Sequence, residues 1–180
     1  SVSTDASNNM WIGSTIPGGN TGQYNTVSGK SALQNNTSGG SNTASGYLAL
    51  NANETGGNNT ASGVSALSNN TGGGSNTASG ASALKNNAWG GKNTAIGVSA
   101  LSINVYGSNN TAIGYNANVS TGSTLQNATA IGANATVTDS NTIQLGNDDV
   151  KRVIIGTSTT TTECALNLPP STYSKVDFST

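Results

Sequence analysis

The 180-residue chain contains no histidine, a single cysteine and very few charged or aromatic residues. Cys164 has no partner in the chain, so an intrachain disulfide is excluded. Without histidines or cysteine pairs the chain lacks the usual ligands of zinc, and no metal or other cofactor is expected.

Charge and hydrophobicity exclude two further classes of partner. Six Lys and Arg residues against seven Asp and Glu residues leave a net charge of -1, which gives no basic surface for nucleic acid. No apolar run approaches the roughly 20 residues that a membrane-spanning helix needs, so membrane insertion is not expected.

Large aliphatic residues are also scarce, since Leu, Ile, Val and Phe together make up only about 17% of the chain. A chain this poor in apolar residues and in charge can still order itself if small polar residues repeat in register and satisfy their backbone groups coil by coil. Its apolar content is too small for a conventional core in one chain. We therefore expect a homo-oligomer in which partner chains bury part of the surface.

What the chain does contain is a repeat with an unbroken spacing of 17 residues. The string Asn-Thr-(Ala/Val)-(Ser/Ile)-Gly begins at Asn25, Asn42, Asn59, Asn76, Asn93 and Asn110. A second string, Ser-Ala-Leu or Leu-Ala-Leu, follows in step from Ser31 to Leu101. Self-similarity at a short fixed period indicates stacked units, so we predict an all-β parallel β-roll, or solenoid, with one 17-residue coil per repeat. Aligned coils would stack about 4.8 Å apart.

Within each coil we predict two short strands and two turns. The first strand lies in Asn-Thr-Ala-Ser-Gly and the second around Ser-Ala-Leu. The closing loops, such as residues 35–40 and 69–74, are rich in Asn and Gly, which tolerate positive φ.

Equivalent positions of successive coils form columns that indicate two buried surfaces. Alanines occupy two columns, from Ala44 to Ala112 and from Ala32 to Ala117, and predict a thin interior. The residue after the first of these alanines points to the other face. It is Ser in the early coils and becomes Ile96, Ile113 and Ile131, so we expect neighbouring chains to cover this outer column. We expect the leucine column from Leu33 to Leu101 to contribute to the same contact.

Composition divides the chain into three segments. Residues 1–24 are predicted to cap the roll, with Trp11 and Ile12 in a strand over its open end. Residues 25–146 form the repeat roll, whose last, altered copy ends at Leu145-Gly146. Residues 147–180 bring charges and β-branched residues together and are predicted to form a neck and tail.

Catalysis is not predicted. Polysaccharide hydrolysis needs paired carboxylates, and Glu54 is the single acidic residue between Asn25 and Gly132. The adjacent pair Asp148 and Asp149 stands beside Lys151 and Arg152, a pattern that surface ion pairing explains.

One turn column departs from the repeat by carrying aromatic residues, Trp89 and Tyr106, one coil apart. Flat aromatic faces on an exposed loop pack against sugar rings. Lys85 and Lys92 lie near Trp89 in the sequence, and Asn87 and Asn104 would supply hydrogen bonds. The alternative is that the two rings pack on each other or on an adjacent chain. Tyr47 and Tyr115 are weaker candidates of the same kind. A separate hypothesis is ice binding through the threonine column from Thr26 to Thr111.

The strings Asn93-Thr94-Ala95-Ile96-Gly97, Asn110-Thr111-Ala112-Ile113-Gly114 and Thr129-Ala130-Ile131-Gly132 resemble the head repeats of YadA-like trimeric autotransporter adhesins. The longer unit, Asn-Thr-Ala-x-Gly-x-x-Ala-Leu followed by Asn and Gly, is similar to head repeats of phage and large-virus tail fibres. The resemblance covers about residues 25–156.

This resemblance implies a left-handed parallel β-roll and a homotrimer in which three chains pack about a common axis. Ile96, Ile113, Ile131 and Leu145 would face that axis. It also implies an extracellular, non-enzymatic segment of a viral or phage surface fibre that binds a host receptor or glycan. The alternative is the head of a bacterial adhesin on the cell surface. The 17-residue units and the early serines at the axis-facing position differ from the adhesin pattern and favour the viral fibres.

Overall fold

The computed structural model describes residues 2–13, 17–120 and 124–150, and in this part of the chain every regular element is a β-strand. The strands are β1 (Val2–Thr4), β2 (Met10–Ile12), β3 (Thr26–Ser28), β4 (Thr43–Ser45), β5 (Thr60–Ser62), β6 (Thr77–Ser79), β7 (Thr94–Ile96), β8 (Thr111–Ile113), β9 (Asn118–Val119), β10 (Thr129–Ile131), β11 (Thr136–Val137) and β12 (Ile143–Leu145).

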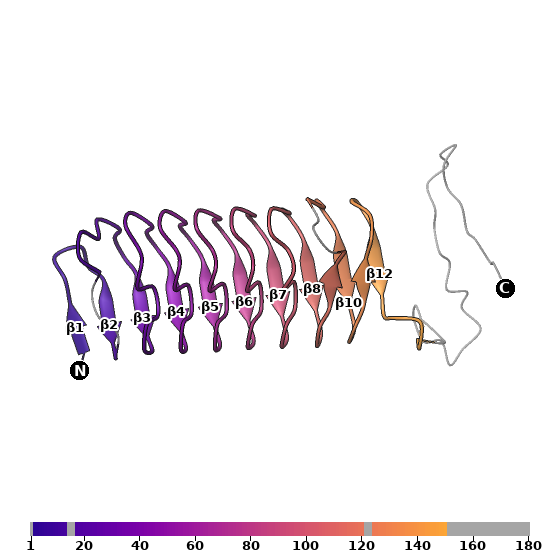
Figure 1. Ribbon diagram of the computed structural model, residues 1–180, viewed down its shortest axis with the longest axis horizontal. Coiled ribbons are helices and arrows are strands. Elements are labelled where there is room, and N and C mark those ends of the chain that lie inside the picture. The colour runs from indigo at the N-terminus through magenta and orange to yellow at the C-terminus, as the bar shows by residue number, and fades with distance from the viewer. Residues whose placement is uncertain (1, 14–16, 121–123, 151–180) are drawn as a thin grey trace, which may run out of the picture. The chain divides into compact units, whose positions relative to one another are not determined.

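Ten of these strands form one long sheet in the order β1-β2-β3-β4-β5-β6-β7-β8-β10-β12 (Figure 1). From β2 onward every pair is parallel, and in the regular coils partners lie 17 residues apart, as Thr43 does from Thr60. The chain is therefore a parallel β-solenoid of about eight coils, which confirms the predicted all-β fold and coil length.

The predicted second strand is wrong for the regular coils, because the Ser-Ala-Leu segment is a turn. Its Ser and Leu both have positive φ, 56° at Ser65 and 52° at Leu67. Each Leu N–H still donates to a carbonyl of the next coil, as Leu67 does to Ala83 at 2.9 Å. Within the described part of the chain, only the last coils have strands on this side, where β9 pairs with β11.

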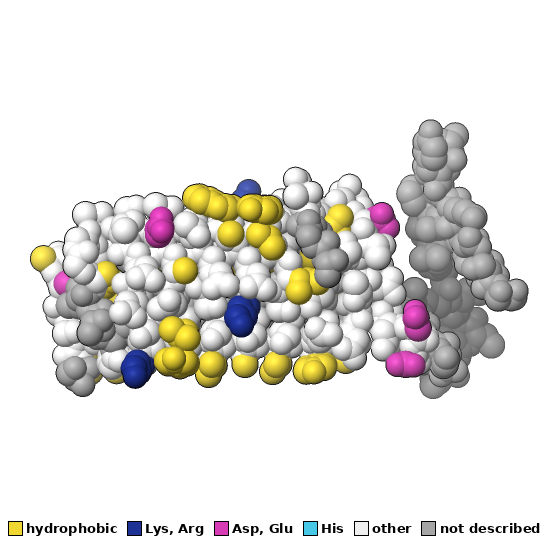
Figure 2. Space-filling model, viewed as in Figure 1, with side chains coloured by type: hydrophobic (Ala, Val, Ile, Leu, Met, Phe, Trp, Pro, Cys, Tyr) yellow, Lys and Arg dark blue, Asp and Glu magenta, His cyan; other side chains and the backbone are white. Residues whose placement is uncertain are grey.

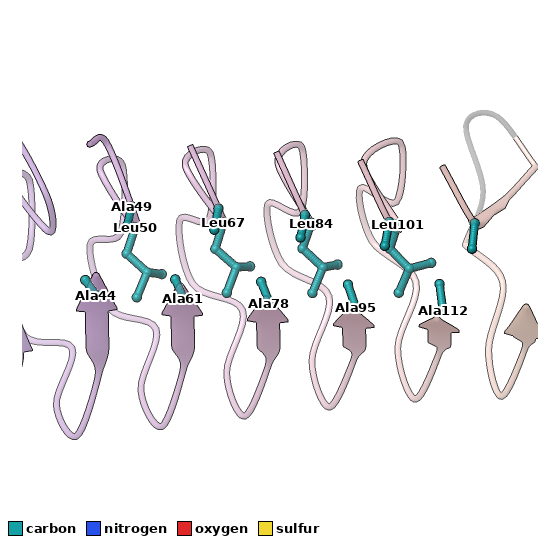
Figure 3. Close-up of a cluster of buried hydrophobic side chains, with 14 of the residues drawn as sticks. Ala44, Ala49, Leu50, Ala61, Leu67, Ala78, Leu84, Ala95, Leu101 and Ala112 are labelled. Atoms are coloured by element: carbon teal, nitrogen blue, oxygen red, sulfur yellow. The ribbon is translucent and has the colours of Figure 1, made fainter. Parts of the chain in front are cut away.

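This turn also explains why the leucine column lies inside the coils and not between chains. In a pleated strand, neighbouring Ala and Leu side chains would face opposite sides, but the positive φ values turn both inward. Leu50, Leu67, Leu84 and Leu101 are fully buried and project toward the strand alanines (Figure 3). The prediction that leucines contribute to a contact between chains is therefore wrong, whereas the thin alanine-lined interior is present.

A glycine ends the outer strand of each coil because no side chain fits there. Gly46 has a φ of 134°, and a Cβ at this position would lie 2.5 Å from the carbonyl oxygen of Gly63 in the next coil. The coils approach one another so closely at this corner that any other residue would force them apart.

The first coil is held by a carboxylate. The strand predicted at Trp11 and Ile12 is present as β2, and β1 pairs with its outer edge in antiparallel fashion. The Asp5 carboxylate accepts hydrogen bonds from the backbone N–H groups of Ser7 and Asn9, from the Asn9 amide and from Trp11 Nε1. Partial burial raises the pKa of Asp5, but these bonds outweigh it and hold the pKa below its usual value. Trp11 is fully buried, so it has no surface to offer a ligand.

The chain divides into two units, and the first, which contains the coils, runs from Ser1 to Asp149. Most of the predicted neck and tail, residues 151–180, lies outside the described residues, as do Cys164, Lys151 and Arg152.

Candidate functional site

Two columns of buried asparagines hold the turns of successive coils together, a feature that the sequence analysis missed. The first column precedes the outer strands and comprises Asn9, Asn25, Asn42, Asn59, Asn76, Asn93 and Asn110. Its side chains link neighbouring coils: Asn25 Oδ1 accepts from the Asn42 N–H at 2.9 Å, and Asn25 Nδ2 donates to the Gly39 carbonyl at 3.0 Å.

The second column comprises Asn36, Asn53, Asn70, Asn87 and Asn104. Each amide donates to the carbonyl of the glycine three residues later and to the asparagine of the coil before. Asn70 Nδ2, for example, lies 2.9 Å from Gly73 O and 2.7 Å from Asn53 Oδ1. Because buried amides need such partners, both columns act as internal hydrogen-bond ladders.

This second ladder corrects part of the predicted ligand site. Asn87 and Asn104 have no exposed surface, and their amide groups are bonded to Gly90, Gly107 and each other. They fix the turns that carry the aromatic residues and are not free to bind a ligand. The 17-residue spacing of the Asn-Asn and Asn-x-x-Gly pairs was the signal that would have identified them.

Trp89 lies at the tip of one of these fixed turns. Its backbone N–H donates to the Val105 carbonyl of the next coil at 3.3 Å, and the N–H of Ala88 donates to the same oxygen at 2.9 Å. The indole ring lies back over Gly72 of the preceding coil. Its carbons Cζ3 and Cε3 are so close to this glycine that an added Cβ would collide with them. The Cζ3–Cε3 edge of the ring therefore lies against the backbone of Gly72, while 59% of the residue is exposed.

Tyr106, one coil later in the same column, is 58% exposed. On this face hydrophobic side chains gather at the upper edge over β5 to β7, and a basic side chain borders them (Figure 2). The structure thus places both predicted aromatic residues on the surface, with the Trp89 ring leaning away from the coil of Tyr106.

Lys85 and Lys92 are exposed at the two ends of the turn that carries Trp89. Leu84 and Asn93, which flank these lysines on the outer sides, are fully buried, so the backbone at both ends is anchored in the core. Lys92 has a φ of 58°, and its N–H donates to the Gly74 carbonyl at 2.9 Å. Between Glu54 and Asp139 the chain has no acidic residue, so these lysines are the only charged groups of that stretch.

The outer column of the sheet changes character along the stack, as predicted. Ser45, Ser62 and Ser79 are exposed in β4 to β6, and from β7 the column becomes Ile96, Ile113, Ile131 and Leu145. These four large side chains remain 40–44% exposed in the single chain, in register on adjacent strands. An aligned strip of exposed aliphatic residues on a rigid sheet is a surface suited to a partner.

A second exposed row follows the corner glycine of each coil. It includes Tyr47, Val64, Val98 and Tyr115, and Figure 2 shows a regular row of hydrophobic side chains along the lower edge of this face. Each member of this row stands two residues after the outer Ser or Ile column in the sequence. Tyr47 and Tyr115 therefore belong to this corner row and not to the turn column of Trp89.

The described residues also bear on metal binding, membrane insertion and cavities. No group of three or more metal-binding side chains occurs among them. The described residues form no helix, and therefore none that could cross a bilayer. A polar hollow of about 370 Å³ at the C-terminal coils is lined by Asn134, Thr136, Thr138, Gln144 and Asp148, among others. It contains none of the predicted site residues.

Comparison with known proteins gives no relative: no protein-family model, no curated protein and no solved structure matches this chain.

Proposed function

We propose that this chain is a structural and adhesive segment of an extracellular, homotrimeric viral or phage surface fibre, built as a left-handed β-roll and attaching to a host receptor or glycan. The solenoid acts as a rigid spacer, and its irregular turn at Trp89 provides the contact with the host. The same architecture suits the head of a bacterial trimeric adhesin, which is the alternative.

The observation that carries the proposal is the outer strip of Ile96, Ile113, Ile131 and Leu145. Each of these side chains is at least 40% exposed in the single chain, although the interior of the coils is filled by Ala and Leu. Burying them against two further copies would remove an exposed apolar strip from water, at about 25 cal/mol per Å² of apolar surface. Packing against partner chains would in this way add the buried apolar surface that the small core of a single chain lacks.

Light scattering coupled to size-exclusion chromatography tests the proposal. We expect the chain to elute at three times its mass of 17.7 kDa. Ile113→Asp, which places a charge in the centre of the strip, should shift the mass to that of one chain. Trp89→Asp, an equally drastic change at an exposed residue outside the strip, should keep the trimer. A monomeric wild type would refute the proposal.

A second candidate is ice binding, which the outer face of β3 to β6 favours. Thr26, Thr43, Thr60 and Thr77 are exposed there in register, beside the exposed serines of the next column. Hydrogen bonds between coils are made mostly by backbone groups and asparagines, and the hydroxyls that take part in them belong to turns and not to this array, which faces outward. Thermal hysteresis of the purified protein measures this activity directly, and a freezing point equal to the melting point rejects it.

A further inference from the structure

We infer that the Trp89 turn binds an acidic saccharide, with a sugar ring stacked on the indole and the acidic group paired with Lys85 or Lys92. This deepens the proposed attachment function and rests on it. It assigns a chemical class to the ligand: a glycan that carries carboxylate or sulfate groups.

The indole is built as a fixed platform. Other coils carry Ser38 or Thr55 at the position of Gly72, and here the missing side chain makes room for the ring. The turn beneath it is held by Asn87, whose amide donates to Gly90 O at 2.8 Å and to Asn70 Oδ1 at 2.9 Å. A ring that is held against the Gly72 backbone along one edge and is otherwise largely exposed loses little conformational freedom when a sugar packs on it.

The positive charge of this turn favours acidic sugars over neutral ones. Lys85 and Lys92 flank Trp89 in the sequence and are the only charged residues between Glu54 and Asp139. The closest acidic residue in the sequence, Glu54, lies two coils earlier, about 10 Å along the stack and about one Debye length away. A neutral sugar would leave both ammonium groups without a role, whereas a carboxylate or sulfate would form charge-assisted hydrogen bonds with them.

The same two lysines argue against nucleic acid, whose recognition rests on many phosphate contacts. The net charge of the whole chain is -1, so no extended basic surface supports such a ligand. Tyr106 presents a second exposed aromatic side chain, and its backbone position is one coil further along the stack, about 4.8 Å from that of Trp89. The site therefore suits an oligosaccharide lying along the solenoid.

Binding of the full chain to immobilised saccharide pairs tests this inference. Each pair shares its sugar rings and differs in charge: trigalacturonic acid and its methyl ester, sialyllactose and lactose, and sulfated and unsulfated lactosamine. We expect at least one acidic member to bind about tenfold more tightly than its neutral partner, and this preference to fall as salt rises. Single-stranded DNA serves as the nucleic-acid probe and should not bind.

Variants then connect the binding to the turn. Trp89→Ala should abolish it, and Lys85→Gln and Lys92→Gln should each weaken it by about three- to tenfold. Lys30→Gln, which removes the other exposed lysine of the described coils, is the matched control and should leave it unchanged. Gly72→Thr keeps the indole but displaces its ring, and should weaken binding without touching a ligand-contacting residue.

Fluorescence gives an independent readout. The chain has two tryptophans, and Trp11 is fully buried, so iodide quenching reports on Trp89 alone. Acidic saccharide should protect Trp89 from iodide. Equal binding of both members in every pair, binding of DNA in their place, or an equal effect of Lys30→Gln would overturn the inference. Each of these results leaves the trimer measurement untouched, so failure of the ligand class is distinguishable from failure of the proposed fibre function.

Discussion

Replacing Asn70 by alanine tests whether the buried asparagine ladder stabilises the stack. Asn70 Nδ2 donates to Asn53 Oδ1 and to Gly73 O, and its Oδ1 accepts from Asn87 Nδ2 at 2.9 Å. Gly73 O retains the bond from Asn59, and Asn87 Nδ2 retains its bond to Gly90. The substitution therefore leaves Asn53 Oδ1 without its partner and one N–H of Asn87 unpaired, both in the interior.

Each buried polar group that loses its partner costs about 1–3 kcal/mol, so the two groups together should lower the free energy of unfolding of Asn70→Ala by about 2–6 kcal/mol. For a chain of this size that corresponds to a fall in Tm of about 4–24 °C. Circular dichroism during thermal unfolding measures it, with the protein concentration held constant because association also stabilises the fold.

The neighbouring residue provides a matched control. Asn69 is exposed, and its one side-chain hydrogen bond, to Asn86 Oδ1, also lies on the surface. Asn69→Ala should change the free energy of unfolding by no more than about 0.5 kcal/mol. Equal effects of the two substitutions would refute the reasoning, because they would show that burial of the amide does not determine its contribution.

Two further predictions concern the corner glycine and the first coil. Gly46→Ala should destabilise the chain by at least about 3 kcal/mol in thermal unfolding, because the new Cβ would meet Gly63 O and the backbone is in a region that is strained for alanine. Gly18→Ala is the control and should be neutral, because no atom lies within 4 Å of the added Cβ. Since the pKa of Asp5 lies below its usual value of 3.8 when folded, the stability that its ionised form contributes is complete above pH 3.8 and is lost as the pH falls through the lowered value. Trp11 fluorescence in a Trp89→Phe background should therefore show an acid transition that Asp5→Asn removes, and an unchanged transition in Asp5→Asn would contradict this.

The repeat made much of the fold predictable. A strict 17-residue period is only compatible with stacked equivalent coils, so the parallel register of Thr43 with Thr60 and the inward alanine columns followed from the sequence. Side-chain alternation along a strand also predicted that the column of Ile96 and Ile113 points outward. The exposure of Trp89 and Tyr106 was predictable because they interrupt a column of small polar residues in a turn.

The conformation of the turns was not predictable in the same way. Leu67 looks like a strand residue by composition, but its positive φ turns it into the core, and only the close contact between coils compensates for a conformation that Leu rarely adopts. Asparagines such as Asn87 looked like polar loop residues available to a ligand. Their burial depends on a glycine carbonyl of the same turn and on the asparagine side-chain oxygen of the coil before, which both accept hydrogen bonds from the amide.

The sequence by itself determined the architecture, because periodicity is a property of the chain and forces each residue type into a column that every coil repeats. The tertiary structure decided which face each column presents and what the side chains touch. Trp89 shows the difference: its type and turn position were readable in the sequence, but its support on Gly72 arises from two coils that meet only when the solenoid is stacked. The same stacking separates buried Asn87 from exposed Lys85 and Lys92, which leaves the lysines and the indole as the exposed part of the predicted ligand site.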